Sequence, residues 1–411
     1  METKSFEMEN IEEHYAKSLA RLTDDFYALD RVYKEYGGEK GYDWPGDYEG
    51  RYLLALVCLE KVTGRKIPRL QEFMVMLDGK LNEKGYFGLI DTSIADEQAL
   101  FGHNWVLRGL LKYYEVYGDK TALEKAKRVV DNFYMVFAPA YEYYPETPRE
   151  KLGGTAGNVL KEENGWKLST DVGAAFAPID GLAHYYAITK DENVLRLLNK
   201  LIATFMRLDK QVLRLQTHTT LTVARGIFTL YQATEDTKYY DMAKEIYDLY
   251  LNVAFTYTYE NYNWFTQKDS WTEPCAVVDS LILALSFYRE TGEKEFKTLA
   301  RRIWFNGLRF AHRDNGGAGT ASCVHASNNK YKMMMYEAHF CCTMRYCEGL
   351  EWIFDNKELF VWQNKAVETD ELGRRFIDDC LLVEKDGERI LMPTLLYTPK
   401  EEAQKLEFRI F

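Results

Sequence analysis

The sequence predicts a mainly α-helical fold, an (α/α)6 barrel of six helical hairpins followed by a small C-terminal β module. Two observations predict the barrel: a helix end rich in aromatic residues followed by a tight turn recurs along the chain, and a second apolar helix follows each turn. A change to strand-like residues after Phe360 predicts the module. We therefore expect residues 1–358 to form the barrel and residues 359–411 to form the β module.

The recurring pattern is clearest in four segments, residues 113–119, 185–191, 230–236 and 287–293. After each turn, apolar residues recur at spacings of three and four, which places them on one stripe of a second helix. In the first of these copies the stripe comprises Leu123, Ala126, Val129, Val130 and Phe133. A more divergent copy begins at Tyr52 and turns at Thr63-Gly64, and a sixth starts near Cys347 and turns at Asp355-Asn356.

Six hairpins can stack as an open solenoid or close into a ring of six inner and six outer helices. The second helices keep polar faces, whereas the segments leading into the first helices carry Trp, Tyr, His and Gly in place of a plain leucine stripe. This difference favours closure, with the first helices inside. In such a barrel the inner helices and the long loops opposite the short turns line a central cavity, which is the expected ligand site.

The C-terminal segment has the pattern of a β-hairpin. Residues 381–391 read as two strands joined at Asp386-Gly387, and residues 394–398 read as a further strand. This module is too short for a whole sandwich, so its exposed edges need cover from the barrel or from a second chain. A homodimer through the β module is one such arrangement.

Composition and charge exclude several classes of partner. The 411 residues carry a formal net charge of −11, so there is no excess of Lys and Arg to neutralise nucleic-acid phosphates or an anionic membrane. A neutral small molecule fits better. The first residues are polar and lack an apolar signal region, and seven cysteines in a long chain suit a reducing compartment. We expect a cytoplasmic protein.

Two short stretches, Glu273-Pro274-Cys275 and Cys341-Cys342, offer one carboxylate and three thiols. Zinc favours thiolate sulfur, takes about four ligands and accepts a carboxylate oxygen. Pro274 restricts Glu273 to extended backbone, so both residues of the first stretch can reach one ion. Adjacent cysteines form a strained disulfide, which favours free thiols in the pair. The alternative is that these cysteines are small buried apolar residues.

These two stretches resemble the metal motifs of the β-L-arabinofuranosidases of glycoside hydrolase family 127, which carry a Glu-x-Cys element and a later Cys-Cys pair on one zinc ion. The resemblance spans roughly residues 44 to 355 and implies Zn²⁺ held by Glu273, Cys275, Cys341 and Cys342. It also implies retaining hydrolysis of β-L-arabinofuranosides or a related neutral sugar, with Cys341 as nucleophile. The family's acid/base glutamate lies upstream of Glu-x-Cys, and Glu260 is our candidate for it.

Weaker expectations concern the substrate, a small oligosaccharide or glycoside. His103 and His218 begin inner helices and could bind sugar hydroxyls, although a core histidine is an equal alternative for each. His339, Trp271 and Tyr336 complete the expected substrate-binding set. Two other functions stay open: a metal-independent sugar epimerase or unsaturated-uronide hydrolase on the same barrel, and a catalytically silent carbohydrate-binding protein. The second is suggested by Thr343-Met344-Arg345, which stands where the family has Pro-Pro-Asn.

Overall fold

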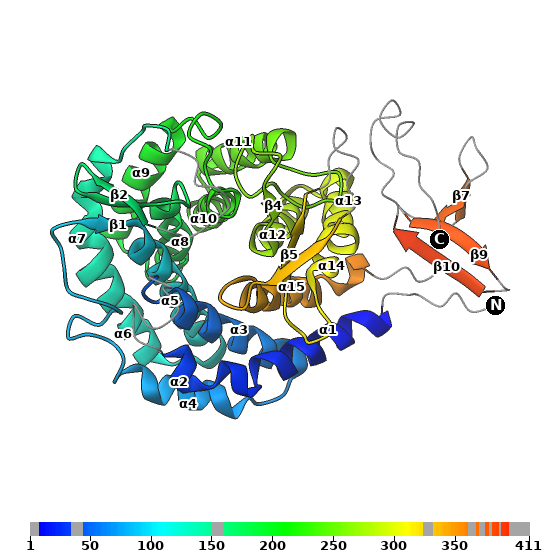
Figure 1. Ribbon diagram of the computed structural model, residues 1–411, viewed down its shortest axis with the longest axis horizontal. Helices are drawn as coiled ribbons and strands as arrows, with labels where there is room; N and C mark the ends of the chain where they lie inside the picture. The colour runs from blue at the N-terminus through cyan, green and yellow to red at the C-terminus, as the bar shows by residue number, and fades with distance from the viewer. Residues whose placement is uncertain are drawn as a thin grey trace.

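The computed structural model describes residues 8–33, 44–149, 159–323 and 332–360, together with the short ranges 367–369, 375–377, 380–385 and 388–393. Within these residues the helices form a ring of two layers, with a small sheet to one side (Figure 1). The predicted (α/α)6 barrel with a small β module is therefore confirmed.

Six helices form the inner layer of the ring, and each packs against the next. The last of them packs against the first, which closes the barrel and excludes the open solenoid. Their side chains are buried on nearly all sides, as expected of helices surrounded by protein. These inner helices are α3 (Asp47–Thr63), α5 (Glu97–Tyr117), α8 (Pro178–Thr189), α10 (Thr217–Thr234), α12 (Pro274–Thr291) and α15 (Cys342–Asp355).

Short turns with left-handed caps end the inner helices. In four of them the carbonyl of a tyrosine accepts an N–H bond from the residue four positions later, at 2.7 to 2.8 Å. Gly118 and Gly292 take up the positive φ of this cap without a steric cost, whereas Lys190 and Glu235 adopt it as non-glycine residues. These bonds place the predicted turns after Tyr114, Tyr186, Tyr231 and Tyr288 at the C-terminal ends of the inner helices.

The outer layer consists mainly of the helices that follow those turns. Each buries one stripe against the inner ring. After the first of the four turns, in α6 (Lys120–Val129) and the π-helical segment that follows, the predicted stripe residues Ala126, Val129, Val130 and Phe133 are buried, and Leu123 is half-buried. Two outer helices, α6 and α13, extend through short π-helical segments into α7 (Met135–Phe137) and α14 (Arg309–Ala311). The outer helices after the turns are α4 (Pro68–Leu77), α6 (Lys120–Val129), α9 (Glu192–Arg207), α11 (Thr237–Val253) and α13 (Lys294–Arg302).

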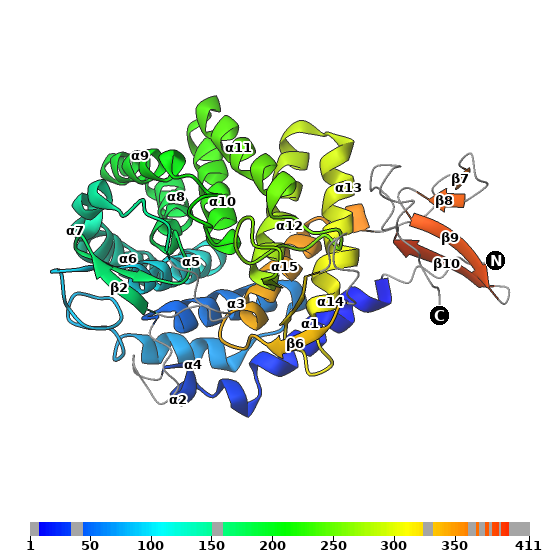
Figure 2. The same cartoon turned by 45° about the horizontal axis from the view of Figure 1, so that its top comes forward.

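The expected sixth hairpin is wrong in one respect. The helix α15 does end at the predicted turn, but the only helical segment that follows it in the described residues is a short 3-10 turn, Lys357–Phe360. The sixth outer position is filled by α1 (Met8–Leu22), which packs against both α15 and α3. Figures 1 and 2 show this N-terminal helix beside α15 and α3. The repeat could not reveal this because α1 comes from the other end of the sequence.

Three small sheets complete the described structure. Two lie in the loops that enter the inner helices: β1 (Ala95–Asp96), β3 (Trp166–Ser169) and β2 (Val159–Glu163) form one, and β4 (Trp271–Thr272), β5 (Gly319–Ser322) and β6 (Met334–Glu337) form the other. The sequence predicted these segments only as long loops. The strands are only two to five residues long and are flanked by glycine and polar residues, so the sequence showed no strand pattern there.

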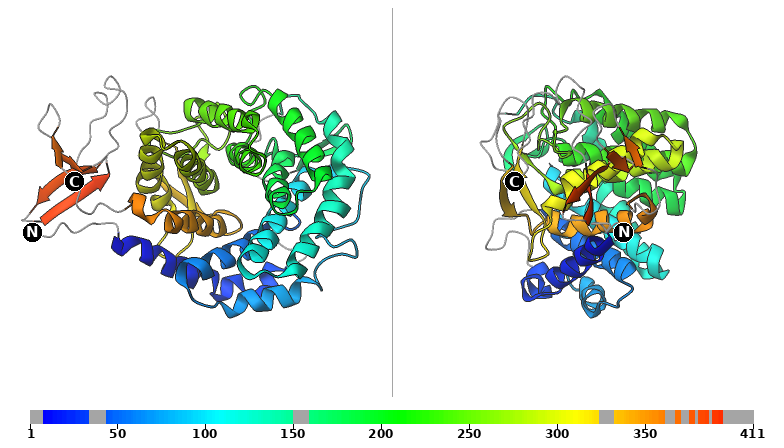
Figure 3. Two further views of the ribbon diagram at one scale, coloured as in Figure 1. Left: turned by 180° about the vertical axis from the view of Figure 1, so that it is seen from behind. Right: turned by 90° about the vertical axis from the view of Figure 1, so that its right-hand side faces the viewer.

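The third sheet is the C-terminal β module, which lies beside the barrel in the view from behind (Figure 3, left). It has the antiparallel order β10-β9-β8-β7. The predicted hairpin is confirmed, since Lys385 of β9 pairs with Glu388 of β10. The strand expected at residues 394–398 falls outside the described residues. The strands are β7 (Val367–Thr369), β8 (Arg375–Ile377), β9 (Cys380–Lys385) and β10 (Glu388–Pro393).

No helix in the described part of the chain is both long enough and apolar enough to cross a membrane. The inner helices instead bury charged residues, among them Arg225 and Arg345.

The position of α1 generates a stability prediction. Leu22, the last residue of α1, has no exposed surface, so Leu22→Ala should lower the free energy of unfolding by about 2–5 kcal/mol. Val75→Ala on outer helix α4, where the side chain is 81% exposed, is the control and should change it by less than about 0.5 kcal/mol. Urea unfolding followed by tryptophan fluorescence measures both. Equal midpoints for the two variants would mean that α1 does not contribute to the barrel.

Candidate functional site

One carboxylate and three thiols meet where two neighbouring inner helices begin. The ligand atoms of Glu273, Cys275, Cys341 and Cys342 all lie within 4.8 Å of one another. The Sγ atom of Cys342 is 3.4 Å from that of Cys275 and 3.4 Å from that of Cys341. We call these four residues the thiol cluster. The residues chosen from sequence as a metal site are therefore brought together by the fold.

The local backbone explains how residues so close in sequence share one centre. Glu273 caps α12 in an extended conformation (φ −120°, ψ 111°), and Pro274 takes the first helical position. Cys341 caps α15 with φ −144° and ψ −68°, which turns its side chain out of the helix that Cys342 begins. Glu273 and Cys275 thus lie at the N-terminus of α12, and Cys341 and Cys342 lie at that of α15. The helix dipole favours anionic groups such as thiolates at these positions.

The donor set fits a zinc ion. A tetrahedral shell with Zn–S bonds of about 2.3 Å separates its sulfurs by about 3.8 Å, close to the observed spacing. Burial raises the pKa of all three thiols well above the ordinary value. Burial, with a smaller contribution from Asp171, also raises the pKa of Glu273 to about 8. A bound cation reverses these shifts because it favours the deprotonated ligands.

Three residues that sequence reasoning missed, Gln216, Asn261 and Asp171, lie around the cluster carboxylate. Gln216, which caps α10, donates its amide N–H to Oε2 of Glu273 at 2.8 Å. The backbone N–H of Glu273 is bonded to Oδ1 of Asn261 at 3.1 Å. Asp171, 9% exposed, is close enough to Glu273 to act on its pKa. None of the three belongs to a motif, so only the folded loops reveal them.

A buried network of ion pairs fills the barrel axis next to the thiol cluster. Asp279 accepts bonds from Arg225 at 2.7 Å and Arg345 at 2.6 Å through Oδ1, and contacts His218 at 2.6 Å through Oδ2. Glu348 accepts from Arg225 at 2.7 Å, and it also pairs with Arg108 and Arg345. We call this set, with Asp47, Arg51 and Asp180, the axial network. Its arginines and carboxylates are at most 5% exposed.

The structure places His218 within this network. Its Nδ1 lies 2.6 Å from Asp279, and its Nε2 lies 3.4 Å from the guanidinium of Arg51. Since an arginine only donates, Nε2 is the acceptor and Nδ1 carries the proton. Burial lowers the pKa of His218 to about 4, which agrees with a neutral ring. Both nitrogens are therefore used inside the protein.

His103 is also engaged with its surroundings. Its Nε2 accepts the backbone N–H of Phe87 at 3.0 Å, and its Nδ1 lies 2.7 Å from the carbonyl of Ala99. The side chain is fully buried, and burial lowers its pKa to about 4. These contacts favour the alternative that His103 is a core histidine.

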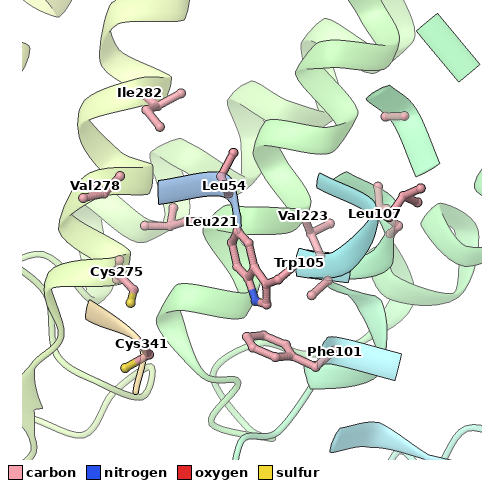
Figure 4. Close-up of a cluster of buried hydrophobic side chains, with 14 of the residues drawn as sticks. Leu54, Phe101, Trp105, Leu107, Leu221, Val223, Cys275, Val278, Ile282 and Cys341 are labelled. Carbon is pink, nitrogen blue, oxygen red and sulfur yellow. The ribbon is translucent and has the colours of Figure 1, made fainter. Parts of the chain in front are cut away.

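The other three expected substrate-binding residues, Trp271, Tyr336 and His339, are more exposed than His103 and His218. Trp271 stands edge-on to Trp264 with ring centres 5.0 Å apart, on strand β4 next to Glu273. Tyr336 on β6 is 45% exposed, and its pKa is raised by burial and by the nearby cluster residues. The half-buried ring of His339 packs against Phe26, with centres 4.9 Å apart. Figure 4 shows Phe101 and Trp105 projecting from α5 toward Cys275 and Cys341.

The carboxylate of Glu260 has a different set of neighbours. Its Oε1 pairs with Nζ of Lys332 at 2.7 Å, and its Oε2 accepts from the Thr258 hydroxyl at 2.7 Å. Among the described residues, none of its side-chain bonds reaches the thiol cluster. The side chain is 2% exposed, and burial raises its pKa although Lys332 and Thr258 oppose the shift.

A separate cavity of about 430 Å³ opens at the other end of the barrel, among the short turns. Arg225 and Glu348 of the axial network form part of its lining, together with His184 and Trp352. The axial network therefore lies between this cavity and the thiol cluster. None of the cluster residues lines this cavity.

The fold is shared with several known structures, although no protein-family model and no curated protein matches the sequence. A β-arabinofuranosidase of family GH127 aligns with a TM-score of 0.54 and 13% identity over 93% of this chain and 61% of its own. The GH127 β-L-arabinofuranosidase of Geobacillus stearothermophilus T6 aligns with a TM-score of 0.55 and 9% identity, over 94% and 71%. An unsaturated glucuronyl hydrolase specific for heparin gives 0.56 and 13%, over 85% and 98%.

These similarities establish a six-hairpin fold that carbohydrate-active enzymes use. Sugar epimerases share it as well. The chain spans about three fifths of the length of the first arabinofuranosidase, 61%. Activity and substrate are therefore matters for a proposal.

The thiol cluster predicts a bound metal. Purified protein should contain about one zinc ion per chain, and Cys342→Ser should lose most of it because a ligand is removed. Cys347→Ser is the matched control, since Cys347 lies buried in the same helix α15 but outside the cluster. Elemental analysis of protein prepared without chelators gives the answer. Equal zinc in the two variants would disprove the site.

The environment of His103 predicts a pH effect on stability. Its pKa in the folded state, about 4, is below the ordinary value of 6.5, so its contribution is complete above pH 6.5 and is lost as the pH falls toward 4. The loss should reach on the order of 3 kcal/mol. His103→Gln should therefore show a shallower decrease in the free energy of unfolding between pH 7 and pH 4.5 than the wild type. Parallel curves from urea unfolding at several pH values would contradict this assignment.

Proposed function

We propose that this protein is a retaining glycoside hydrolase that uses a zinc-bound thiolate, acting on β-L-arabinofuranosides or a related neutral sugar. One observation carries the proposal: a carboxylate and three thiols within 4.8 Å, at the inner-helix N-termini of a fold that carbohydrate-active enzymes share. Zinc bound there would keep the thiols deprotonated and make sulfur a better leaving group.

Exposure distinguishes Cys341 as the nucleophile. It is 8% exposed, whereas Cys275 and Cys342 are fully buried. A sugar can therefore approach the sulfur of Cys341 without displacing the other two. The position at the start of α15 further favours the anionic form of this side chain.

The reaction proceeds in two displacements. Sγ of Cys341 attacks the anomeric carbon and forms a C–S bond as the bond to the leaving oxygen breaks, while a carboxylic acid gives that oxygen its proton. The resulting carboxylate then removes a proton from water. The water oxygen bonds to the anomeric carbon, and the thiolate of Cys341 leaves. The configuration at that carbon is retained.

The proton donor in this proposal is Glu260, and burial raises the pKa of its carboxyl, which is the direction that a general acid needs. To serve, its side chain must leave Lys332 when substrate binds. Asp171 is the competing candidate, because it lies beside Glu273 within the cluster region. Glu337, bonded to Arg21 at 2.9 Å, is a third carboxylate near the cysteine pair.

Two other functions differ from this proposal because neither of them requires the cysteines. A metal-independent epimerase or unsaturated-uronide hydrolase would work through His or Asp, but His103 and His218 have both ring nitrogens engaged. A silent carbohydrate-binding protein would bind sugar without turnover.

Kinetics of two variants on nitrophenyl and alkyl glycosides test the separate roles of Cys341 as nucleophile and Glu260 as proton donor. Cys341→Ser should abolish turnover of both substrates, because the atom that attacks carbon is lost. Glu260→Gln should slow alkyl glycosides by about 10²–10⁴-fold and activated nitrophenyl glycosides much less, since a good leaving group needs little proton transfer.

Asp171→Asn is the matched comparison for Glu260→Gln. If Asp171→Asn shows the dependence on the leaving group and Glu260→Gln does not, the proton donor is Asp171. Full activity of Cys341→Ser would reject the thiolate mechanism.

A further inference from the structure

Arg51 is the one cationic side chain bonded to the thiol cluster within the described residues. It projects from α3, is 2% exposed, and places Nη1 3.7 Å from Sγ of Cys275. The other two guanidinium nitrogens have separate partners: Nε donates to Asp47 at 2.7 Å, and Nη2 to His218 at 3.4 Å. A planar fork with fixed donor directions can satisfy all three partners at once.

The orientation of Arg51 is fixed from several sides. Asp279 holds the proton on Nδ1 of His218, so Nε2 is left to accept from Arg51. The guanidinium also lies over the ring of Trp105 at 4.2 Å and near Phe101 at 5.3 Å. These contacts run in series from Asp279 through His218 and Arg51 to Cys275. They direct the Nη1–H group of Arg51 toward Sγ of Cys275.

The three sulfurs of the cluster consequently differ. Cys275 accepts an N–H from an arginine, whereas the bonds that the structure describes for Sγ of Cys341 and Cys342 run within the cluster. A hydrogen bond from a cation withdraws charge from a thiolate and is among the stronger bonds in proteins. Such a bond matters more in a buried site, where a zinc ion with these four ligands carries net negative charge.

We infer that Arg51 is a positioning residue that makes the three thiolates unequal, drawing charge from Cys275 and leaving Cys341 as the more electron-rich sulfur. This inference rests on the proposed zinc-thiolate site and adds a reason for the choice of nucleophile. Arg51 acts through Cys275 and does not itself touch the reacting carbon.

Cobalt substitution of the full chain tests the inference without an activity assay. The energy of the thiolate-to-cobalt charge-transfer bands reports the electron density on sulfur. Arg51→Met should move these bands to longer wavelength, because Cys275 loses its donor, and should weaken zinc binding by about 10–100-fold. Arg51→Lys keeps the cation but not the fork, so its bands should also move.

Arg108→Met is the matched control. Arg108 is 5% exposed and pairs with Asp180 and Glu348 in the same axial network, but none of the bonds described for it reaches a thiol. Its cobalt bands should match those of the wild type. His218→Phe, which keeps a ring against Trp105 and removes the acceptor for Arg51, should shift the bands in the same direction as Arg51→Met.

The outcomes separate this inference from the proposed function. Absence of cobalt and zinc binding by the unaltered chain would overturn both. Cobalt binding with identical bands in Arg51→Met, Arg108→Met and the wild type would overturn only the role of Arg51. Circular dichroism checks folding, and if Arg51→Met does not fold, Arg51→Lys and His218→Phe decide the question by the same bands.

Discussion

The buried polar contacts of the axial network connect all six inner helices, and the geometry of the barrel depends on them. Ion pairs join α5, α8, α10, α12 and α15, and the hydrogen bond from Arg51 to His218 joins α3 to α10. Removing one partner of a buried pair leaves a charge without compensation, at a cost of about 3–5 kcal/mol. The four arginines and the four carboxylates of the network balance in formal charge. Asp279 is central, since it joins His218, Arg225 and Arg345.

The direction of the inner helices decides what each end of the barrel can do. Left-handed caps place the short turns at one end, so the helix N-termini and the long loops meet at the other. There the partial positive charges of α12 and α15 face the thiols, and the loops supply Gln216, Asn261 and Asp171. None of these groups lines the cavity at the turn end. The thiol cluster and this cavity thus lie at different ends of the barrel.

Sequence patterns sufficed for parts of the structure that depend on local residues. Helix periodicity and the tyrosine turns gave five hairpins, and Pro274 gave the extended backbone of Glu273. The sixth outer helix was missed because its place depends on a contact between distant segments. His103 and His218 were ambiguous because a sequence does not tell which groups meet a ring nitrogen. The roles of Arg51 and Gln216 could not be predicted, since each depends on a single contact between distant segments.

The N-terminal helix α1 completes a ring whose last inner helix is encoded near the other end of the barrel sequence. During synthesis the apolar face of α1, with Tyr15 and Leu22, leaves the ribosome long before α15 exists to cover it. Closure of the ring therefore waits for almost the whole chain, and contacts of such sequence separation form slowly. A nascent chain with an open seam exposes apolar surface, which is the kind of surface that chaperones bind. The order of synthesis thus creates an incomplete ring with exposed apolar surface, and this surface is covered only when the ring closes.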